Sequence, residues 1–394
     1  MSKTLIAWEK GSGAGHLSRI SKIARSIECL GQQVDLVIPS RHSNNPWFEE
    51  ITSKALVVNP KNCSPSFLTG IESFASMLVM FGLTDKKYLM DQVKYWLDLF
   101  ELKQTKNIVL DYSPIAQLVA YLIGMKAYQI TDGFCAPTKD CPLFPSQVFY
   151  SINEQNNKKV IESINESISY VCRQINNHDE MDFQGYLNHP LKVYDTIPEL
   201  DPYGQCNSSN SLGPLIDSNI NQKLTFKDLG KPLKVFIYLR HNSIIGKEVL
   251  TYLFRNKIST VCVYPDATTF ELQESKNSSI QMTRTPVDYN TVVKDCTHVM
   301  SYGATGTICS AVLMGKPQLQ FPGDTQKKMV CAKLQALKTS VVIDSSTRAH
   351  TDIVVKEFLS NDTLLDNAKS FSECYKRPAF ENNYKCFVEK ILNE

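Results

Sequence analysis

The sequence predicts an α/β protein with two halves of similar size, each built around a parallel sheet. In the first half, a short apolar segment at residues 3–8 is followed by a glycine-rich turn, a helix-like periodicity and a second apolar segment at 34–40. The same succession begins again at residues 232–240, after a stretch rich in Pro, Asn, Ser and Gly. A strand, a helix and a second strand of this kind form a βαβ unit, and its strands pair in parallel.

Length and composition are those of an ordinary globular protein. A chain of 394 residues corresponds to two or three domains at about 100–200 residues each. Apolar residues make up 43% and charged residues 21%, which excludes a disordered or fibrous chain. The net charge of +2 does not indicate a nucleic-acid partner, although a local basic patch stays open.

The sequence also bears on compartment and metal binding. The longest nearly apolar stretch, at 73–83, is shorter than the ~20 residues that a membrane span needs, and the amino terminus has no signal-peptide pattern. The 12 cysteines include no CxxC pair, so we expect free thiols in a reducing compartment and no metal site. The expected protein is cytoplasmic, with no membrane span.

In the first half, the elements are expected in a regular order. The helix after the first turn has apolar residues three or four positions apart and ends at Gly31. A strand at 107–114 leads into a second helix, a further strand covers 127–134, and 151–175 has the pattern of a surface helix.

The second half repeats this order of strands and helices. We expect helices near 245–256, 305–315 and 326–337, strands between them, and a helical carboxyl-terminal segment. The polar, Pro- and Gly-rich stretch runs from about Asn188 to Lys231. The predicted domains are 1–205 and 232–394, with 206–231 as the linker and the last helix able to pack back on the first domain.

The glycine turn at 11–16 (GSGAGH) is the first candidate site. Gly13 and Gly15 would let a ligand approach the backbone at a helix N-terminus. The third glycine of the dinucleotide fingerprint is missing, because Leu17 and Ser18 follow His16. His16 stands where the first strand opens into the helix, and a histidine there can accept a proton from a hydroxyl near neutral pH. The alternative is that His16 only caps the helix or packs under a loop.

Asp111 ends the strand at 107–111, which brings its carboxylate to the same edge of the predicted sheet. A carboxylate behind a histidine fixes the imidazole tautomer and stabilises the imidazolium. Asp111 is therefore a candidate partner of His16. The alternative is an N-cap, since Asp before Ser-Pro is a good capping residue.

The second candidate site is the strand–helix turn within 301–317. Gly303, Thr305, Gly306 and Thr307 would offer N–H and O–H donors at the positive end of a helix dipole, which suits a diphosphate. The alternative is an ordinary connection. The following turn contains two polar residues, Asp324 and Gln326. Their side chains could hold sugar hydroxyls or could simply face solvent.

These segments resemble the GT-B fold glycosyltransferases, in particular the group that includes UDP-glucuronosyl- and UDP-glucosyltransferases and bacterial macrolide and antibiotic glycosyltransferases. Residues 6–40 are similar to the family's first strand, glycine turn and helix, and 108–131 to the strand that bears the dyad aspartate. Residues 212–215 are similar to the segment before the linker. The most specific match is 285–343, which is similar to the donor-binding region.

The resemblance implies two Rossmann-like, doubly wound parallel-sheet domains that face each other across a cleft. It implies an inverting, nucleotide-sugar-dependent hexosyl- or pentosyltransferase, with UDP among the expected nucleotides. His16 would deprotonate an acceptor hydroxyl with Asp111 behind it, and the 303–307 turn would hold the leaving diphosphate. No cofactor and no metal would be required, because the helix dipole and neutral donors carry the charge.

The sequence departs from the family pattern in the donor region. Tyr302 stands where the family has a diphosphate-contacting histidine, and Ser310 stands where it has an acidic residue that binds the ribose hydroxyls. A serine cannot hold both hydroxyls as a carboxylate does. Arg240 is a candidate for the missing positive charge, or else a surface arginine. Gly13, Gly15 and Val287 are also placed among the donor-binding residues.

The expected partners are a nucleotide-sugar donor and a hydroxyl-bearing acceptor, which could be a small molecule, a glycan or modified DNA. Aromatic residues and Met within 41–100 could form an apolar acceptor pocket, or they could be core positions. Basic segments at 40–46 and 227–234 could instead bind a polyanion, such as modified, hydroxylated viral DNA. The donor-site departures also allow a non-catalytic GT-B binding protein. A sugar-nucleotide epimerase of the same fold is less favoured, because the sequence lacks the extra carboxylates that such an enzyme would need near the donor.

Overall fold

A computed structural model shows how these segments fold. It describes residues 3–11, 13–42, 48, 56–58, 68, 70–145, 154–175, 180–216, 224–240, 243–375 and 377–393. The chain divides into two compact units: the first comprises Met1–Asp195, Tyr203–Leu215 and Glu381–Glu394, and the second Thr196–Pro202 and Ile216–Phe380. The predicted linker at 206–231 is thus divided between the two units after Leu215.

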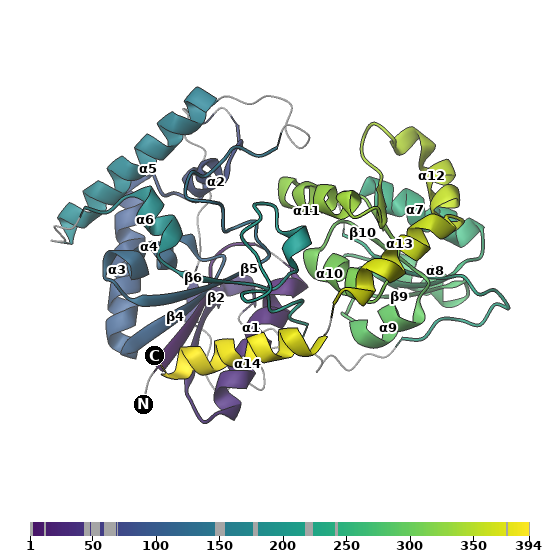
Figure 1. Ribbon diagram of the computed structural model, residues 1–394, viewed down its shortest axis with the longest axis horizontal. Coiled ribbons are helices and arrows are strands. Elements are labelled where there is room, and N and C mark those ends of the chain that lie inside the picture. The colour runs from purple at the N-terminus through teal and green to yellow at the C-terminus, as the bar shows by residue number, and fades with distance from the viewer. Residues whose placement is uncertain are drawn as a thin grey trace. The chain divides into compact units, whose positions relative to one another are not determined.

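The first unit is built on a parallel sheet with strand order β3-β2-β1-β4-β5-β6 (Figure 1). Its strands are β1 (Lys3–Trp8), β2 (Val34–Pro39), β3 (Leu56–Val58), β4 (Thr105–Asp111), β5 (Lys126–Thr131) and β6 (Leu191–Tyr194). Its other elements are α1 (Ala14–Cys29), η1 (Ser40–His42), α2 (Phe74–Met80), α3 (Lys86–Lys103), α4 (Pro114–Leu122), α5 (Glu154–Gln174) and α6 (Phe183–Asn188).

The second unit has a sheet of the same kind, with strand order β12-β11-β10-β7-β8-β9 and parallel pairing. Its strands are β7 (Lys234–Tyr238), β8 (Ser259–Val263), β9 (Ile280–Thr283), β10 (His298–Ser301), β11 (Gln318–Gln320) and β12 (Ser340–Val342). Its other elements are η3 (Pro198–Leu200), α7 (Ile244–Arg255), α8 (Thr269–Lys276), α9 (Tyr289–Asp295), α10 (Thr305–Leu313), α11 (Thr325–Ala336), η4 (Arg348–His350), α12 (Thr351–Leu359) and α13 (Asp362–Glu373).

Both sheets have the order of a doubly wound α/β fold, and this order locates the candidate sites. The direction of winding reverses between β1 and β4 in the first unit and between β7 and β10 in the second. Ligands of open α/β sheets bind outside the carboxyl ends of the strands at such a reversal. The loops after these four strands are therefore where function is expected.

Local sequence explains the elements that carry these loops. Every residue of β2 is buried, as expected for a strand covered on both faces by helices. On α1, apolar side chains three or four residues apart face the sheet, and their burial anchors the helix. They are Leu17, Ile20, Ile23, Ala24 and Ile27.

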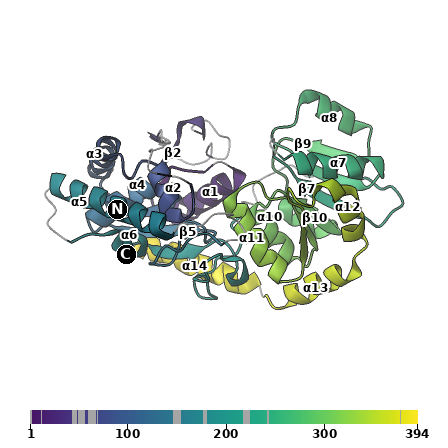
Figure 2. The same cartoon turned by 90° about the horizontal axis from the view of Figure 1, so that it is seen from above.

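One segment differs from the sequence-based expectation. The edge strand β6 lies within the stretch from Asn188 that we expected to be connection; its Val193 and Tyr194 are buried and pair along β5. The last helix, α14 (Arg377–Asn393), has its residues from Glu381 onward in the first unit. Its Phe387 and Ile391 pack in that unit's core, and Phe387 contacts Tyr128 of β5. The helix is drawn in yellow in Figures 1 and 2.

No helix among the described residues combines the length and the apolar character needed to cross a membrane.

Candidate active site

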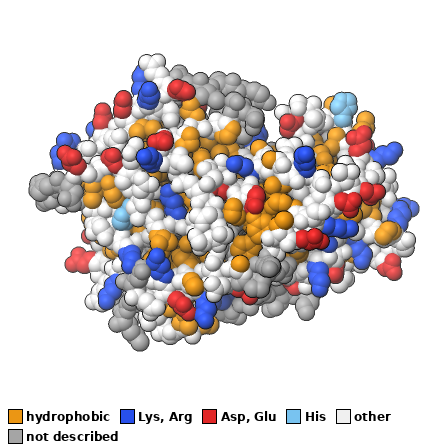
Figure 3. All heavy atoms as spheres, in the orientation of Figure 1, with side chains coloured by type: hydrophobic (Ala, Val, Ile, Leu, Met, Phe, Trp, Pro, Cys, Tyr) orange, Lys and Arg blue, Asp and Glu red, His pale blue; other side chains and the backbone are white. Residues whose placement is uncertain are grey.

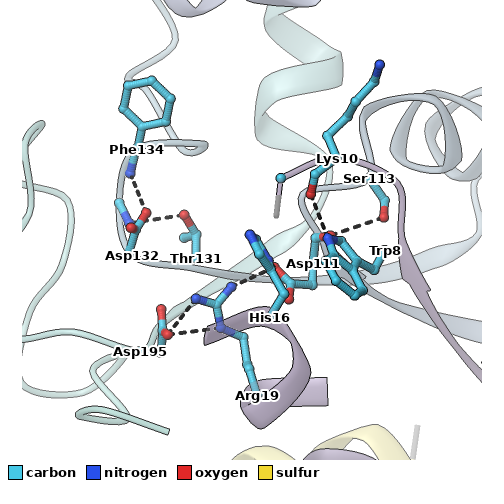
Figure 4. Close-up of polar contacts among 12 residues, drawn as sticks. Trp8, Lys10, His16, Arg19, Asp111, Ser113, Thr131, Asp132, Phe134 and Asp195 are labelled. Atoms are coloured by element: carbon cyan, nitrogen blue, oxygen red, sulfur yellow. Dashed lines mark hydrogen bonds and ion pairs between the residues drawn. The ribbon is translucent and has the colours of Figure 1, made fainter. Parts of the chain in front are cut away.

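His16 and Asp111 meet at the carboxyl edge of the first sheet. His16 lies in the first turn of α1, and Asp111 is the last residue of β4. The imidazole Nδ1 lies 3.0 Å from both Oδ1 and Oδ2 of Asp111 (Figure 4). The Asp111 side chain is 1% exposed and that of His16 is 21% exposed. A carboxylate at Nδ1 selects the tautomer with the proton on Nδ1, which leaves the Nε2 lone pair free to accept a proton.

Asp111 does not cap the helix that follows it. The N-cap residue of α4 is Ser113, and its side chain makes no capping bond. Instead, the buried Glu9 accepts hydrogen bonds from the backbone N–H groups of Ile115 at 2.8 Å and Ala116 at 3.2 Å. Burial raises the pKa of Glu9 to about 7. Because Glu9 satisfies this helix N-terminus, the Asp111 carboxylate is left for His16.

A buried arginine also contacts Asp111. Arg19 Nη1 lies 2.6 Å from Asp111 Oδ1, and Arg19 Nε and Nη2 lie 2.9 Å and 2.6 Å from Asp195 Oδ2. Although burial alone would raise it, Arg19 and His16 hold the pKa of Asp111 below its ordinary value. Burial raises the pKa of Asp195 to about 6 against the attraction of Arg19.

Trp8 supports the ring of His16. The two rings are stacked with centroids 5.1 Å apart, and His42 also stacks on Trp8 at 4.6 Å. Trp8 is fully buried, and its indole N–H donates to the carbonyl of Lys10 at 2.6 Å. Burial, helped by Arg41 and His16, lowers the pKa of His42. The stacked rings restrict the orientation of the His16 imidazole.

In the glycine turn, Gly11 is the position that cannot carry a side chain. Its φ is +89°, and a Cβ built there would lie 2.4 Å from His16 Nε2. A Cβ at Gly13 or Gly15 would meet nothing within 4 Å. Gly13 and Gly15, the predicted residues, therefore have open space around them at the start of α1. The glycine that lies close to His16 is Gly11.

In the second unit, the turn between β10 and α10 and the helix α10 itself contain half of the predicted donor-binding residues: Tyr302, Gly303, Thr305, Gly306, Thr307 and Ser310. Gly303 has a φ of +94°, and a Cβ there would lie 2.8 Å from Lys327 Cβ. Ala304 is the N-cap of α10 and carries no side-chain acceptor. The helix starts with the half-buried Thr305 and the exposed Gly306, and its N-terminal N–H groups and dipole favour an anion.

A row of buried amides fixes this turn. Ser301 Oγ donates to Gln320 Oε1 at 2.6 Å, and Gln320 Nε2 donates to Gln318 Oε1 at 2.9 Å. Gln318 Nε2 in turn donates to the carbonyl of Ile308 in α10. The backbone N–H of Gly303 donates to Ser301 Oγ. The strand ends and the helix are therefore held together by polar contacts inside the core.

Several predicted donor-binding side chains are turned into the protein. Val287 is fully buried among the apolar residues of one core cluster, so that any ligand contact there would involve its backbone. Ser310 is 2% exposed, and its Oγ has no partner among the described residues. Thr307 is buried and donates to Tyr289 Oη at 3.3 Å.

The remaining predicted residues of this edge are charged or polar. Arg240, two residues after β7, lies 3.6 Å from Asp266 and is 35% exposed. Asp324 is the N-cap of α11, where it accepts from the backbone N–H of Lys327 and pairs with its ammonium group. The ammonium group of Lys327 also lies 5.4 Å from the ring centre of Tyr302. Gln326 lies in the first turn of α11 and is half-buried.

The aromatic residues proposed as an acceptor pocket are divided. Trp96 and Phe74 are core residues of the first unit. Met77, Phe81 and Tyr95 are only partly buried. Trp47 and Phe67 lie outside the described residues, as do residues 43–46 of one proposed basic segment. In the other basic segment, 227–234, the Lys227 ammonium donates to the carbonyls of Lys276 and Ser278.

Sequence reasoning missed Arg19, Asp195 and Gly11. The sequence did contain one signal, since three strands of the first sheet are each followed or ended by an aspartate: Asp111, Asp132 and Asp195. Arg19 gave none, because it lies in a helix where a charged residue is ordinarily on the solvated face. For metals, no cluster of three or more potential ligands was found in the described part of the chain.

Comparison with known proteins identifies the fold. No protein-family model matches the chain, and no curated protein matches its sequence. Among solved structures, the spinosyn rhamnosyltransferase SpnG matches with a TM-score of 0.68 and 15% identity, over 100% of both chains. The calicheamicin glycosyltransferase CalG4 matches with a TM-score of 0.66 and 12% identity, over 99% of this chain and 98% of that one.

A further structure is SpnG complexed with thymidine diphosphate, which has a TM-score of 0.65 and 14% identity over 100% of both chains. Full coverage of both chains at these scores means that the whole architecture is shared, not one sheet alone. The predicted fold class is confirmed: the chain has the α/β, two-sheet GT-B fold of these glycosyltransferases.

Proposed function

We propose that the protein is an inverting glycosyltransferase that moves a sugar from a nucleoside-diphosphate sugar to an acceptor hydroxyl. The observation that carries this proposal is the fixed contact of His16 Nδ1 with the buried Asp111 carboxylate, at the switch point of a GT-B sheet. This contact leaves Nε2 as the proton acceptor, so His16 removes the proton of the acceptor hydroxyl as the oxygen attacks the anomeric carbon.

The leaving nucleoside diphosphate is assigned to the second unit. SpnG, which shares the fold, is described in complex with thymidine diphosphate, which supports a nucleoside-diphosphate donor here. The N-terminus of α10, the Thr305 hydroxyl and the Arg240 guanidinium are donors of the kind that stabilise a diphosphate. Ser310 is a buried serine, so that position supplies no carboxylate for the ribose hydroxyls. Binding of UDP and of TDP, measured side by side, identifies the nucleotide base.

Charge carried by protein groups also leads us to propose that no metal is needed. In this reaction the negative charge develops on the diphosphate as the glycosidic bond breaks. We expect the α10 dipole and Arg240 to stabilise that charge.

The acceptor is proposed to be a small hydroxylated molecule. Spinosyn aglycone is bound in another SpnG structure. On the faces of the two units that Figure 3 shows, Lys and Arg side chains are interspersed with Asp and Glu among the described residues. A duplex-DNA acceptor would favour a continuous basic surface, which the described residues of this face do not form.

The test is a transfer assay with a panel of UDP- and TDP-sugars against phenolic, aliphatic and hydroxymethylated-DNA acceptors. We expect release of the nucleoside diphosphate, a product heavier by one glycosyl group, and an anomeric configuration opposite to that of the donor by NMR. Retention of configuration would overturn the inverting mechanism. Binding of nucleotides without turnover of any pair would favour the non-catalytic alternative.

The donor site has its own matched pair of variants. Arg240→Ala should weaken binding of TDP or UDP by about 10-fold or more, because a charge-assisted hydrogen bond contributes roughly 1.5–3 kcal/mol. Arg255→Ala, an exposed arginine at the end of α7 in the same unit, should leave the affinity unchanged. Calorimetry with each nucleotide measures both; equal affinities would remove Arg240 from the site.

A further inference from the structure

Behind His16 lies a buried charge that the proposed reaction does not itself use. Arg19 is three residues after His16 on α1, so both side chains project from the same side of the helix. The Arg19 side chain is only 10% exposed and lies on the face of α1 that carries the apolar core residues. A buried guanidinium is costly unless it is paired and hydrogen-bonded, so its position is specified by its partners.

The partners form a continuous row, which Figure 4 shows from His16 to Asp195. His16 Nδ1 and Arg19 Nη1 both contact the same oxygen, Asp111 Oδ1, at 3.0 Å and 2.6 Å. On its other side, Arg19 is held by Asp195 Oδ2 through both Nε and Nη2. Asp195 follows β6 directly, so the row joins the ends of two strands through one helix.

The shared oxygen has a consequence for the imidazole. A carboxylate that faces a histidine alone stabilises the imidazolium, which holds the proton and cannot act as a base. A guanidinium on that carboxylate offsets part of its negative charge, and Arg19 stays charged throughout the accessible pH range. Burial alone would lower the pKa of Arg19, but Asp111 and Asp195 raise it above its ordinary value.

Other charged groups face this row. Asp132, which follows β5, acts on both Arg19 and Asp195. On the η1 side, His42 and Arg41 lie near His16, and Arg41 donates to the carbonyl of Gly11. Asp132, Arg41 and His42 are present in the wild type and in both variants, so the comparison changes only Arg19 or Asp195 directly.

We propose that Arg19, held by Asp195, is a positioning residue that shares the Asp111 carboxylate with His16 and so reduces the stabilisation that this carboxylate gives to the imidazolium form of His16. This inference rests on the proposed function only for its purpose; the electrostatic coupling itself is a property of the first unit. It also predicts opposite effects for the two partners. Removing Arg19 exposes His16 to the full carboxylate charge, whereas removing the Asp195 charge leaves Arg19 to act more strongly on Asp111.

The test is an NMR titration of the His16 imidazole in the full chain without substrate. The His16→Gln variant identifies its signal among the 7 histidines. In Arg19→Met, the midpoint of the titration should move up by about 1 pH unit or more, the effect expected of an opposite charge within about 4–6 Å. In Asp195→Asn, the midpoint should move down. Arg25→Met, the same change further along α1, should leave it in place.

The outcomes separate this inference from the proposed function. Shifts of opposite sign support the coupling even if no sugar is ever transferred, which would reject only the proposed function. If transfer occurs, the acid limb of log(kcat/KM) against pH should move in the same direction as the titration in each variant. An unchanged midpoint in both variants, or shifts of the same sign, would overturn the inference. Should Arg19→Met not fold, Asp195→Asn decides alone, because an upward or absent shift contradicts it.

Discussion

The two units have the same strand order but very different chemistry at their switch points. In the first, charged side chains are almost fully buried and bonded to one another, with Asp111 at 1% and Arg19 at 10% exposed. In the second, the turn after β10 offers backbone N–H groups and hydroxyls, and Arg240, which follows β7, is 35% exposed. Proton transfer needs a base held in one orientation, whereas binding a diphosphate needs donors that remain accessible. The same topology thus supports either requirement, depending on which side chains follow the strands.

The largest effect that separates the units should come from Asp111→Asn. An amide neither fixes the His16 tautomer in the same way nor stabilises the imidazolium formed in the reaction. Transfer should fall by about 10²–10⁴-fold, the range for general acid–base catalysis. The affinity for TDP or UDP, a property assigned to the second unit, should stay the same. Loss of nucleotide binding together with activity would contradict this division of roles.

The second largest effect concerns the stability of the second unit, which should depend on pH through one histidine. His298 on β10 is buried, and burial lowers its pKa to about 4. Its unfolded value is about 6.5, so the unfolded chain binds the proton first and the neutral histidine stabilises the fold above that pH. As the pH falls from about 6.5 to 4, this stabilisation is lost, by up to about 3 kcal/mol.

The His298→Gln variant removes this pH-dependent contribution of His298 to the free energy of unfolding. The difference in unfolding free energy between wild type and variant should shrink as the pH falls through this window. Hydrogen exchange of the β10 and α12 segments measures it in the second unit. All 3 tryptophans lie in the first 96 residues, so tryptophan fluorescence serves as the control for the first unit and should not respond to the substitution. A pH-independent difference would contradict the assignment.

The sequence was informative where pattern and physics coincide. The helix periodicity of α1, the buried strands and the repeated βαβ order predicted both sheets, and His16 and Asp111 were placed at one edge because parallel strands end together. Arg19 was not predictable, because one arginine inside a helix gives no sign that it turns inward. Gly11 was passed over for Gly13 and Gly15, since the sequence shows that glycines form a turn but not which φ is positive.

A smaller effect compares glycines in pairs. Gly11→Ala and Gly303→Ala force a side chain into positive φ and against a neighbour, and each should destabilise its unit by about 1–3 kcal/mol. Gly13→Ala and Gly306→Ala have open space around the new methyl group and should change stability by less than about 0.5 kcal/mol. Urea unfolding measures all four. Equal losses of stability for Gly11→Ala and Gly13→Ala, or for Gly303→Ala and Gly306→Ala, would show that close contact does not decide which glycine is required.

The smallest expected effect is that of a chelator. If Arg240 and the α10 N-terminus stabilise the leaving diphosphate, EDTA should change the transfer rate by less than about 2-fold. Added Mg²⁺ or Mn²⁺ should also have little effect. Abolition of transfer by EDTA, with recovery on adding one of these ions, would show that the second unit does not supply enough charge by itself.

The central claim is that His16 is the base, and it is tested most directly by comparing His16→Ala with His350→Ala in the transfer assay. His350 is an exposed histidine of the second unit, so its removal controls for loss of an imidazole elsewhere. The account predicts that His16→Ala loses about 10²–10⁴-fold in transfer rate while binding the nucleoside diphosphate as tightly as wild type. Full turnover by His16→Ala would contradict it.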